Sequence, residues 1–245
     1  MAAKHISATK LEIIQVALRM FLERGYSAAS LKSISDEVNI STGNLTFHFP
    51  TKEHMLSVLV EMLCEFQWSM MERAADERRS SLLAQCLELA AMAAICEDSE
   101  IGRDFYLSAY THPSSLEIIR KNDAQRAKAV FGEYCVDWSD LKYREAETLV
   151  SGIEYATMMK TPGSAPLSVR IAGAVGAIML IYCVPEEIRE KKIKKVLRSD
   201  YRLLGKRLLS EFREYVNSFD EAALERVFER IKVYERENQA ESEKM

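Results

Sequence analysis

The stretch from Ser27 to His54, SAASLKSISDEVNISTGNLTFHFPTKEH, decides the fold of this chain. Ser30 and Ser41 each precede a short run with apolar residues at helical spacing, as N-cap residues do. They predict two short helices, joined by a tight turn at Asn39-Ile40. Pro50 cannot continue a helix, so the second helix must end there. The stretch therefore predicts a helix, a turn and a helix.

Longer helices are expected on both sides of this stretch. Before it, apolar side chains follow the i, i+3, i+4, i+7 rule, and Gly25 is placed to end that helix in the left-handed conformation. The apolar positions are Ile14, Ala17, Leu18 and Phe21. After it, Thr51 is a suitable N-cap for a fourth helix. The N-terminal part is thus predicted to be a three-helix helix-turn-helix unit.

The composition favours an all-α protein throughout. Hydrophobic residues make up 48% of the 245 residues, while nine glycines and five prolines are few for this length. Long segments lack strand-like alternation, and the clearest loop is Thr161 to Pro166, TPGSAP. We therefore expect a helix-turn-helix domain over residues 1–55 and a larger helical domain over residues 56–245, and the features described next predict DNA binding for the first and regulation and dimerisation for the second.

The third predicted helix has the surface that a DNA-reading helix needs. Its outward positions Thr42, Gly43 and Asn44 are short, so the helix can approach a groove closely, and an asparagine amide can pair with adenine. Phosphates bind at helix N-termini. Lys52 lies in a first helical turn, where a cation opposes the helix dipole. A bound anion would explain this placement, and a solvated surface lysine is the alternative.

The register of these residues resembles the head of the tetracycline-repressor (TetR) family of bacterial regulators. The matching positions are Ala17, Phe21, Gly25-Tyr26, Ser30, Ile34, Val38, Ser41, Gly43, Leu45, His48-Phe49, Lys52-Glu53 and Leu56. The resemblance covers about 45 residues, and the remainder matches only in being helical and of suitable length. It departs from the family at Thr46-Phe47, where a tyrosine is common. Phe47 is either a core residue or packs against a sugar.

The resemblance implies a homodimer that binds a palindromic operator in double-stranded DNA, represses transcription and is released by a small-molecule effector. The predicted DNA-binding residues are Ser30, Lys32, Ser41, Thr42, Gly43, Asn44, Thr46, His48, Thr51 and Lys52.

Two sites are expected in the second domain. Small residues at four-residue spacing let helices approach closely, and in the family the late helices form the dimer interface. The predicted interface residues are Ile153, Ala172, Gly173, Gly176, Ala177 and Leu180, with packing inside one chain as the alternative. An effector pocket is expected among Met62, Phe66, Met92, Cys96, Phe105, Tyr106, Tyr110 and Trp138, each of which has a core position as its alternative. Eleven methionines suit an apolar or aromatic effector.

Enzymatic and membrane functions find no support in the sequence. It holds no catalytic triad motif, phosphate-binding loop, dinucleotide fingerprint or metal-ligand spacing, so no catalytic residue, metal or cofactor is expected. The five cysteines lack any CxxC and indicate reduced core thiols in a cytoplasmic protein. The start MAAKHISATK is not a signal peptide, and no apolar run is long enough to span a bilayer. The alternative functions are a helical interaction module whose head no longer reads DNA, and a helical enzyme.

Overall fold

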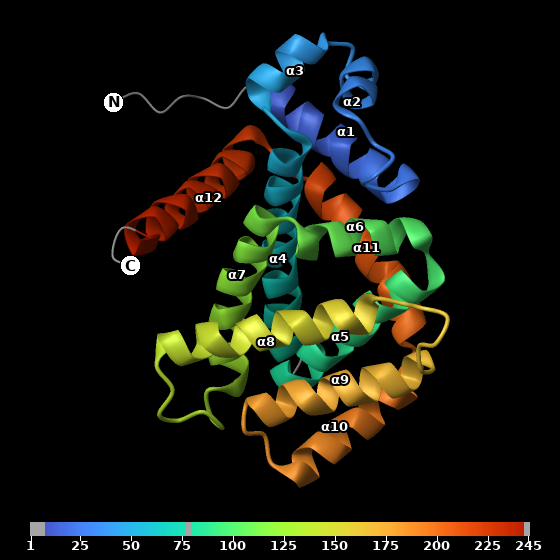
Figure 1. Ribbon diagram of the computed structural model, residues 1–245, viewed down its shortest axis with the longest axis vertical. Helices are drawn as coiled ribbons and strands as arrows, with labels where there is room; N and C mark the ends of the chain where they lie inside the picture. Colours follow the sequence, from blue (N-terminus) through green and yellow to red (C-terminus); the bar gives the residue numbers. More distant parts are fainter. Residues whose placement is uncertain (1–7, 77–79, 243–245) are drawn as a thin grey trace.

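The computed structural model describes residues 8–76 and 80–242, and this part of the chain forms twelve helices and no strand (Figure 1). The all-α prediction is confirmed. No helix within the described ranges is both long and apolar enough to cross a membrane.

The first three helices form the predicted head: α1 (Ala8–Arg24), α2 (Leu31–Glu37) and α3 (Thr42–His48). Both predicted serine caps are confirmed. The Ser30 hydroxyl accepts a hydrogen bond from the backbone N–H of Ser33 at 3.0 Å. In turn, the Ser33 hydroxyl accepts one from the backbone N–H of Ser30 at 2.9 Å. The Ser41 hydroxyl accepts from the N–H of Asn44 at 3.1 Å. Gly25 follows α1 with φ +91°, the left-handed conformation expected of it.

The long helix α4 (Lys52–Asp76) runs from the head down into the rest of the molecule (Figure 1). The helices that follow are α5 (Ser81–Asp98), α6 (Glu100–Thr111), α7 (Pro113–Phe131), α8 (Asp140–Met158), α9 (Leu167–Ile181), α10 (Glu186–Arg198), α11 (Tyr201–Asn217) and α12 (Glu221–Ser242). Helices α8 and α9 lie side by side at the end of the molecule away from the head, with α10 beside α9. The predicted loop at 161–166 joins α8 to α9.

Two hydrophobic cores share the packing. The first begins in the head and continues through α4 and α6 to α11 and α12, where Phe212 and Leu224 are buried in it. The second joins α5, α7, α8, α9 and α10. The head's core therefore extends beyond residue 55, and the division of the chain at that residue stays a prediction. The C-terminal helices α11 and α12 each contact both α1 and α4, so they help to fix the head on α4.

The cysteine prediction is right for four of the five thiols. Cys64, Cys86, Cys96 and Cys135 are buried, whereas Cys183 is exposed. Cys183 lies in the turn after α9, where its backbone has φ +56°.

Candidate nucleic-acid interface and ligand cavity

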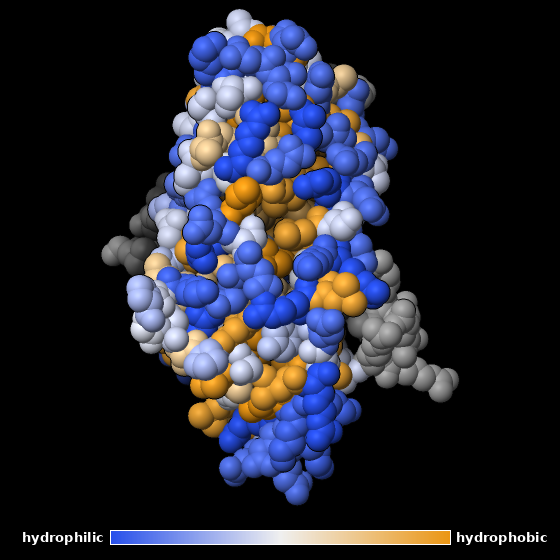
Figure 2. Space-filling view, turned by 90° about the vertical axis from the view of Figure 1, so that its right-hand side faces the viewer, coloured by the Kyte–Doolittle hydropathy of each residue, from blue (hydrophilic) through white to orange (hydrophobic). Residues whose placement is uncertain are grey.

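Helix α3 presents the polar face that its sequence predicted. Leu45 and Phe49 are almost completely buried and fix the helix against the head core. The opposite face exposes Ser41, Gly43 and Asn44. Figure 2 shows the head, at the top, as mainly hydrophilic, with hydrophobic side chains gathered in a depression below it and further down. The face can accept a polar partner, and the DNA contacts of its residues stay predictions.

Two residues of the predicted set use their hydroxyls inside the head. Thr42 lies 3.0 Å from the hydroxyl of Ser35, and this hydrogen bond joins α3 to α2. The hydroxyl of Thr46 donates to the carbonyl oxygen of Gly43 at 3.1 Å. At the position where a tyrosine is common in the family, the Thr46 hydroxyl is therefore engaged by the backbone of its own helix.

Phe47 is not a core residue, so that alternative is wrong. Its side chain is 82% exposed, because Leu45 and Phe49 already occupy the inward positions of this short helix. The ring of Phe47 meets that of His48 edge to face, with 5.4 Å between centroids. Burial, together with the charge of Lys10, lowers the pKa of His48, which favours a neutral imidazole at neutral pH. An aromatic side chain on the outer surface of α3 is thus available to a partner.

Two further cationic and polar candidates flank α3 at the surface. Lys32 is exposed and pairs with Asp36 one helical turn later, at 3.0 Å. The hydroxyl of Thr51 accepts weakly from the N–H of His54, at 3.4 Å, as an N-cap does. Ser30 caps α2 at the same surface. These positions leave helix N-termini facing outward, where phosphate oxygens bind well.

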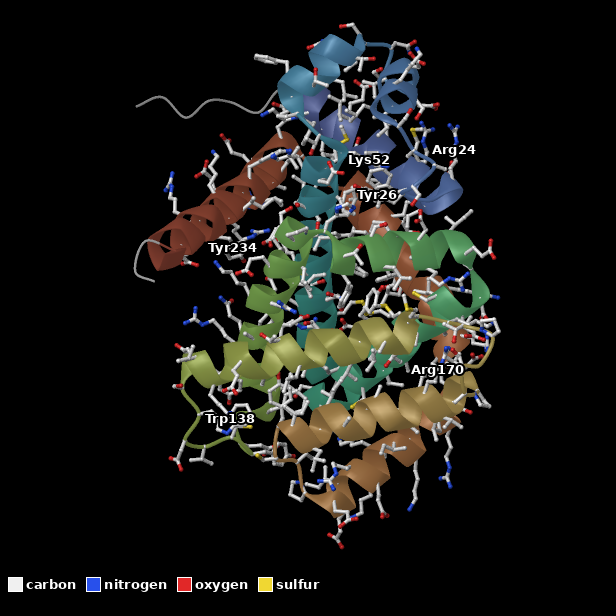
Figure 3. The ribbon with its side chains drawn as sticks, in the orientation of Figure 1. Arg24, Tyr26, Lys52, Trp138, Arg170 and Tyr234 are labelled. Carbon is white, nitrogen blue, oxygen red and sulfur yellow. The ribbon has the colours of Figure 1, made fainter. Side chains whose placement is uncertain are left out.

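Lys52 has protein partners that the sequence did not reveal. Its ammonium donates to the carbonyl oxygens of Tyr26 and Ala29, at 2.8 and 2.9 Å, and lies 4.1 Å from the centre of the Tyr26 ring (Figure 3). Burial lowers the pKa of Lys52. These contacts account for a cation at this helix start without any bound anion, and they tie the loop after α1 to α4.

The same loop is also fixed from below by α6. Asp104 accepts hydrogen bonds from the backbone N–H of Ser27, at 2.7 Å, and from its hydroxyl, at 2.5 Å. Gly25 allows this approach, because a Cβ atom there would lie 2.8 Å from the Asp104 carboxylate. Helix α6 is therefore in direct contact with the head.

The large domain contains a cavity between helices α4 to α9. Its volume is about 40 Å³, which is room for a few water molecules. Three of the predicted pocket residues line it: Met92, Tyr106 and Tyr110. It is reached by side chains from α4, α5, α6, α7, α8 and α9, so it lies at the junction of the two cores.

The other five predicted pocket residues do not line this cavity, and their part in binding an effector stays a prediction. Met62, Phe66, Cys96 and Phe105 are buried in the first core. Trp138 lies in the connection before α8 and packs on Tyr143 and Tyr182, away from the cavity (Figure 3). Helical spacing shows that a residue faces inward, but it does not distinguish close packing from the wall of a cavity.

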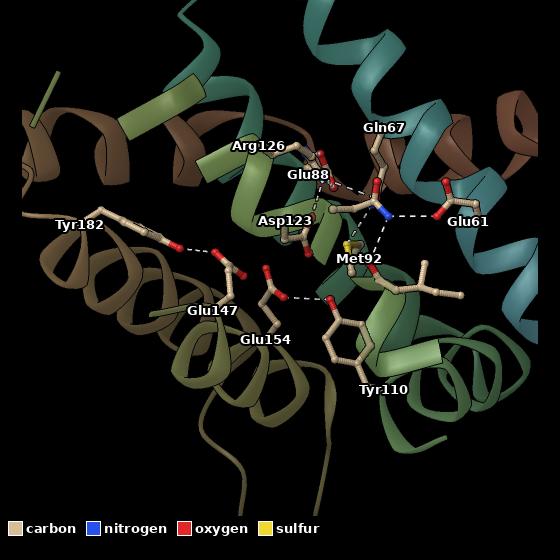
Figure 4. Close-up of polar contacts among 12 residues, drawn as sticks. Glu61, Gln67, Glu88, Met92, Tyr110, Asp123, Arg126, Glu147, Glu154 and Tyr182 are labelled. Atoms are coloured by element: carbon tan, nitrogen blue, oxygen red, sulfur yellow. Dashed lines mark hydrogen bonds and ion pairs between the residues drawn. The ribbon is translucent and has the colours of Figure 1, made fainter. Parts of the chain in front are cut away.

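Several charged side chains are buried at or beside the cavity, and their burial was not predicted from the sequence. Arg126 is 2% exposed, and its guanidinium pairs with Glu88 at 2.5 Å and Asp123 at 3.2 Å. The hydroxyl of Tyr110 donates to Glu154 at 2.8 Å, and Tyr182 donates to Glu147 (Figure 4). Charged residues seven apart on α8 resemble a solvated face in the sequence, so no sequence signal placed them inside.

Burial raises the pKa of these carboxyl groups, because it removes water from their charged form. The pKa of Glu147 rises to about 8, and that of Asp123 rises to about 6 in spite of Arg126. The pKa of Glu154 is also raised, by burial first and then by the negative charges of Asp123 and Glu147. The carboxyl group of Glu147, beside the cavity, is therefore mainly protonated at neutral pH.

A second surface is formed by the outer faces of α8 and α9. Leu149 and Leu180 are each 60% exposed, and Val169 is 57% exposed. Of the predicted interface residues, Gly173 is also exposed, while Ala172 and Ala177 are partly buried. Two predicted residues have contacts within the chain instead. Ile153 packs against the second core, and a Cβ on Gly176 would meet Ile193 of α10 at 3.4 Å.

No group of three or more potential metal ligands occurs within the residues that the structure describes.

Comparison with known proteins identifies the head. Residues 13–59 match the model of the tetR family of bacterial regulatory proteins. The head of this chain is therefore similar to the DNA-binding head of the tetR family. The repressor KstR2 of Mycolicibacterium smegmatis is 30% identical over 71 residues, which are 29% of this chain and 35% of that protein. KstR2 of Mycobacterium tuberculosis is 29% identical over 80 residues, 33% of this chain and 40% of that protein. The match thus spans well under half the length of these relatives.

Solved structures are more distant. The Thermus thermophilus tetR-family repressor FadR, in complex with lauroyl-CoA, shares 15% identity with a TM-score of 0.48, covering 80% of this chain and 94% of that one. KstR2 of Mycobacterium tuberculosis gives 17% identity and a TM-score of 0.31, covering 87% and 97%. TetR-family proteins are regulators, not enzymes.

Replacing Lys52 by methionine keeps the apolar stem and removes the two hydrogen bonds to Tyr26 and Ala29. Because the carbonyl oxygens of Tyr26 and Ala29 then lose a charged donor, we expect the free energy of unfolding, measured by urea denaturation, to fall by about 1–2 kcal/mol. Lys32→Met is the control, since that ammonium is exposed and pairs only with Asp36; it should change stability by less than about 0.5 kcal/mol. Equal stability of the two variants would contradict a stabilising role for the contacts of Lys52 with Tyr26 and Ala29.

Proposed function

We propose that this protein is a dimeric transcriptional repressor that places two copies of α3 in successive major grooves of a palindromic operator. The observation that carries the proposal is the exposed polar face of α3, positioned by two capped helices in a tetR-family register. Base edges would be read by Asn44, with Thr42 and Gly43 allowing close approach. The N-termini after Ser30, Ser41 and Thr51 would bind phosphates.

Helix α3 needs a second copy, because the head offers few free cations. Lys52 is engaged with carbonyl oxygens, and Lys32 pairs with Asp36. Phosphate contacts supply most of the salt-dependent affinity of DNA-binding proteins. A single head with so few available cations would bind weakly, and two linked heads on one operator would bind much more tightly.

The outer faces of α8 and α9 supply the surface for such a dimer. Exposed apolar residues recur at three- and four-residue spacing, which gives one stripe along each helix. The stripe of α8 has Leu149, Gly152 and Ala156, with Met159 at the C-cap, and that of α9 has Val169 and Gly173, with Leu180 two turns further on. Small residues in mid-stripe let helices approach closely, with larger ones packing at the ends. Two-fold pairing of these helices makes a four-helix interface suited to a palindromic site.

The effector would act through α6. This helix lines the cavity with Tyr106 and Tyr110 and contacts the head through Asp104. A ligand that shifts α6 therefore moves the loop that follows α1, and with it the head. In a dimer, this motion would change the distance between the two copies of α3 and release the operator.

Selection of operator sequences from a random DNA library by the purified full chain tests the proposal. We expect a palindromic consensus, and Asn44→Ala should relax the base preference at one position per half-site, by about 1–3 kcal/mol for a bidentate contact. Asn217→Ala, an exposed asparagine on α11, should leave the consensus unchanged. Failure of the wild-type chain to enrich any sequence would favour the alternative, an interaction module whose head does not read DNA.

Leu180→Glu tests the dimer surface, because it places a charge within the apolar stripe of α9. We expect the dimer dissociation constant from sedimentation velocity to rise at least about tenfold, and operator affinity to fall with it. Leu203→Glu is the matched control, since Leu203 is 46% exposed on α11, outside the α8–α9 stripes. A dimer that tolerates Leu180→Glu as well as Leu203→Glu would place the interface elsewhere.

A further inference from the structure

The buried side chains around the cavity carry more negative groups than positive ones. Glu88, Asp123 and Glu154 line it, Glu147 lies beside Glu154 (Figure 4), and Arg126 is the lining cation that pairs with Glu88 and Asp123 among the described residues. Arg126 is already engaged by Glu88 and Asp123. Glu147 and Glu154 instead accept from the hydroxyls of Tyr182 and Tyr110. Arg120 of α7 is the next cation, and its Nε donates to Ser151 at 2.9 Å.

Two buried oxygen acceptors at this place have no hydrogen-bond partner among the described residues. One is Oε2 of Glu147, a side chain that is only 2% exposed. In Figure 4 this oxygen is turned toward Glu154 and Asp123. The other is Oε1 of Gln85, which lines the cavity. Buried acceptors without a donor are costly, so a ligand that brings N–H groups would gain free energy here.

The rest of the lining is apolar and adaptable. It includes Leu63, Leu89, Met92, Val175, Ile178 and Met179. The volume of about 40 Å³ is too small for a drug-sized molecule, so a ligand must displace side chains as it enters. Methionine side chains rearrange readily because they are unbranched. The cavity thus offers an apolar body a place beside a group of carboxyls.

We propose that the effector of this protein carries a protonated amine joined to an apolar or aromatic body, with the ammonium bound between Glu147 and Glu154 and the body among the methionines. This inference deepens the proposed function by naming the class of its effector. An ammonium would donate to the ionised carboxylate of Glu147, whose Oε2 has no partner among the described residues, and would balance the negative charge of the site. A carboxylate or phosphate on the ligand would meet like charges in a low-dielectric site.

The charge change also predicts proton release. Before binding, burial keeps Glu147 mainly protonated at neutral pH, since its pKa is about 8. The charge of Asp123 also disfavours its ionisation, while the hydrogen bond from Tyr182 and the charges of Arg126 and Arg120 favour it. A bound ammonium favours the ionised form strongly, so the carboxyl gives its proton to the solvent as the ligand enters.

The test uses three probes with one body and different headgroups: 4-phenylbutylamine, 4-phenylbutanol and 4-phenylbutyrate. Titration calorimetry of the full chain at pH 7, in two buffers of different ionisation enthalpy, gives the affinity and the number of protons released. We expect the amine to bind at least about tenfold more tightly than the alcohol, with release of roughly half to one proton per amine. The butyrate should bind least.

Glu154→Gln and Glu147→Gln keep the size and the acceptor oxygen of each side chain while removing its charge. Each should weaken amine binding about tenfold or more, leave alcohol binding unchanged, and reduce proton release. Glu190→Gln, on the exposed surface of α10, is the matched control and should behave as wild type. Thermal unfolding of each variant confirms that it is folded.

An amine that binds no more tightly than the alcohol, or that does not bind at all, would overturn the inference, and so would tighter binding of the butyrate. These outcomes leave operator selection by the wild-type chain unaffected. Conversely, charge-selective amine binding with proton release by a chain that selects no operator would support this site and reject the proposed function.

Discussion

The contact between α6 and the loop after α1 is the constraint on which the arrangement of this molecule depends. Asp104 receives two hydrogen bonds from Ser27, and Gly25 makes the approach possible by lacking a Cβ. Lys52 binds two carbonyl oxygens of the same loop from the other side. The loop is therefore fixed to α6 and to α4 at once, and the position of the recognition surface follows from it.

Helix α6 is equally committed to the cavity. Tyr110, one and a half turns beyond Asp104, is buried and donates to Glu154 of α8. The C-terminal helices hold the head from the opposite side. Arg230 of α12 pairs with the buried Glu61 of α4 at 2.6 Å, and the ring of Phe228 packs near that of Phe49. Between these two supports, α6 has contacts with both the cavity and the head, so a change at one can reach the other.

Local signals made the head predictable from the sequence. Serine caps, a left-handed glycine and apolar spacing all act within a few residues, and Ser30, Ser41 and Gly25 behave in the structure as those rules require. The partners of Lys52 lie 23 and 26 residues away in sequence. No local rule reports such a contact, so the lysine was interpreted as an anion-binding group.

The buried residues of the large domain could not be predicted from the sequence, for a different reason. On α8 the usual pattern is reversed: Glu147 and Glu154 are buried, while Leu149 and Ala156 are exposed. In such a helix, polar groups face a cavity and apolar groups would face a second copy of the chain. Its hydrophobic pattern has the helical period, but the pattern does not indicate which side faces the interior. The small residues of α9 were predicted to allow close contact between helices, but Gly176 lies close to Ile193 of α10 in the same chain.

We propose that α6 transmits changes at the cavity to the loop after α1. Amide hydrogen exchange at Ser27, whose N–H donates to Asp104, measures this most directly in Tyr110→Phe and Tyr182→Phe. Each variant removes one tyrosine–glutamate hydrogen bond to α8, but only Tyr110 belongs to α6. We expect faster exchange at Ser27 in Tyr110→Phe and wild-type exchange in Tyr182→Phe. Equal exchange at Ser27 in the two variants would contradict the account.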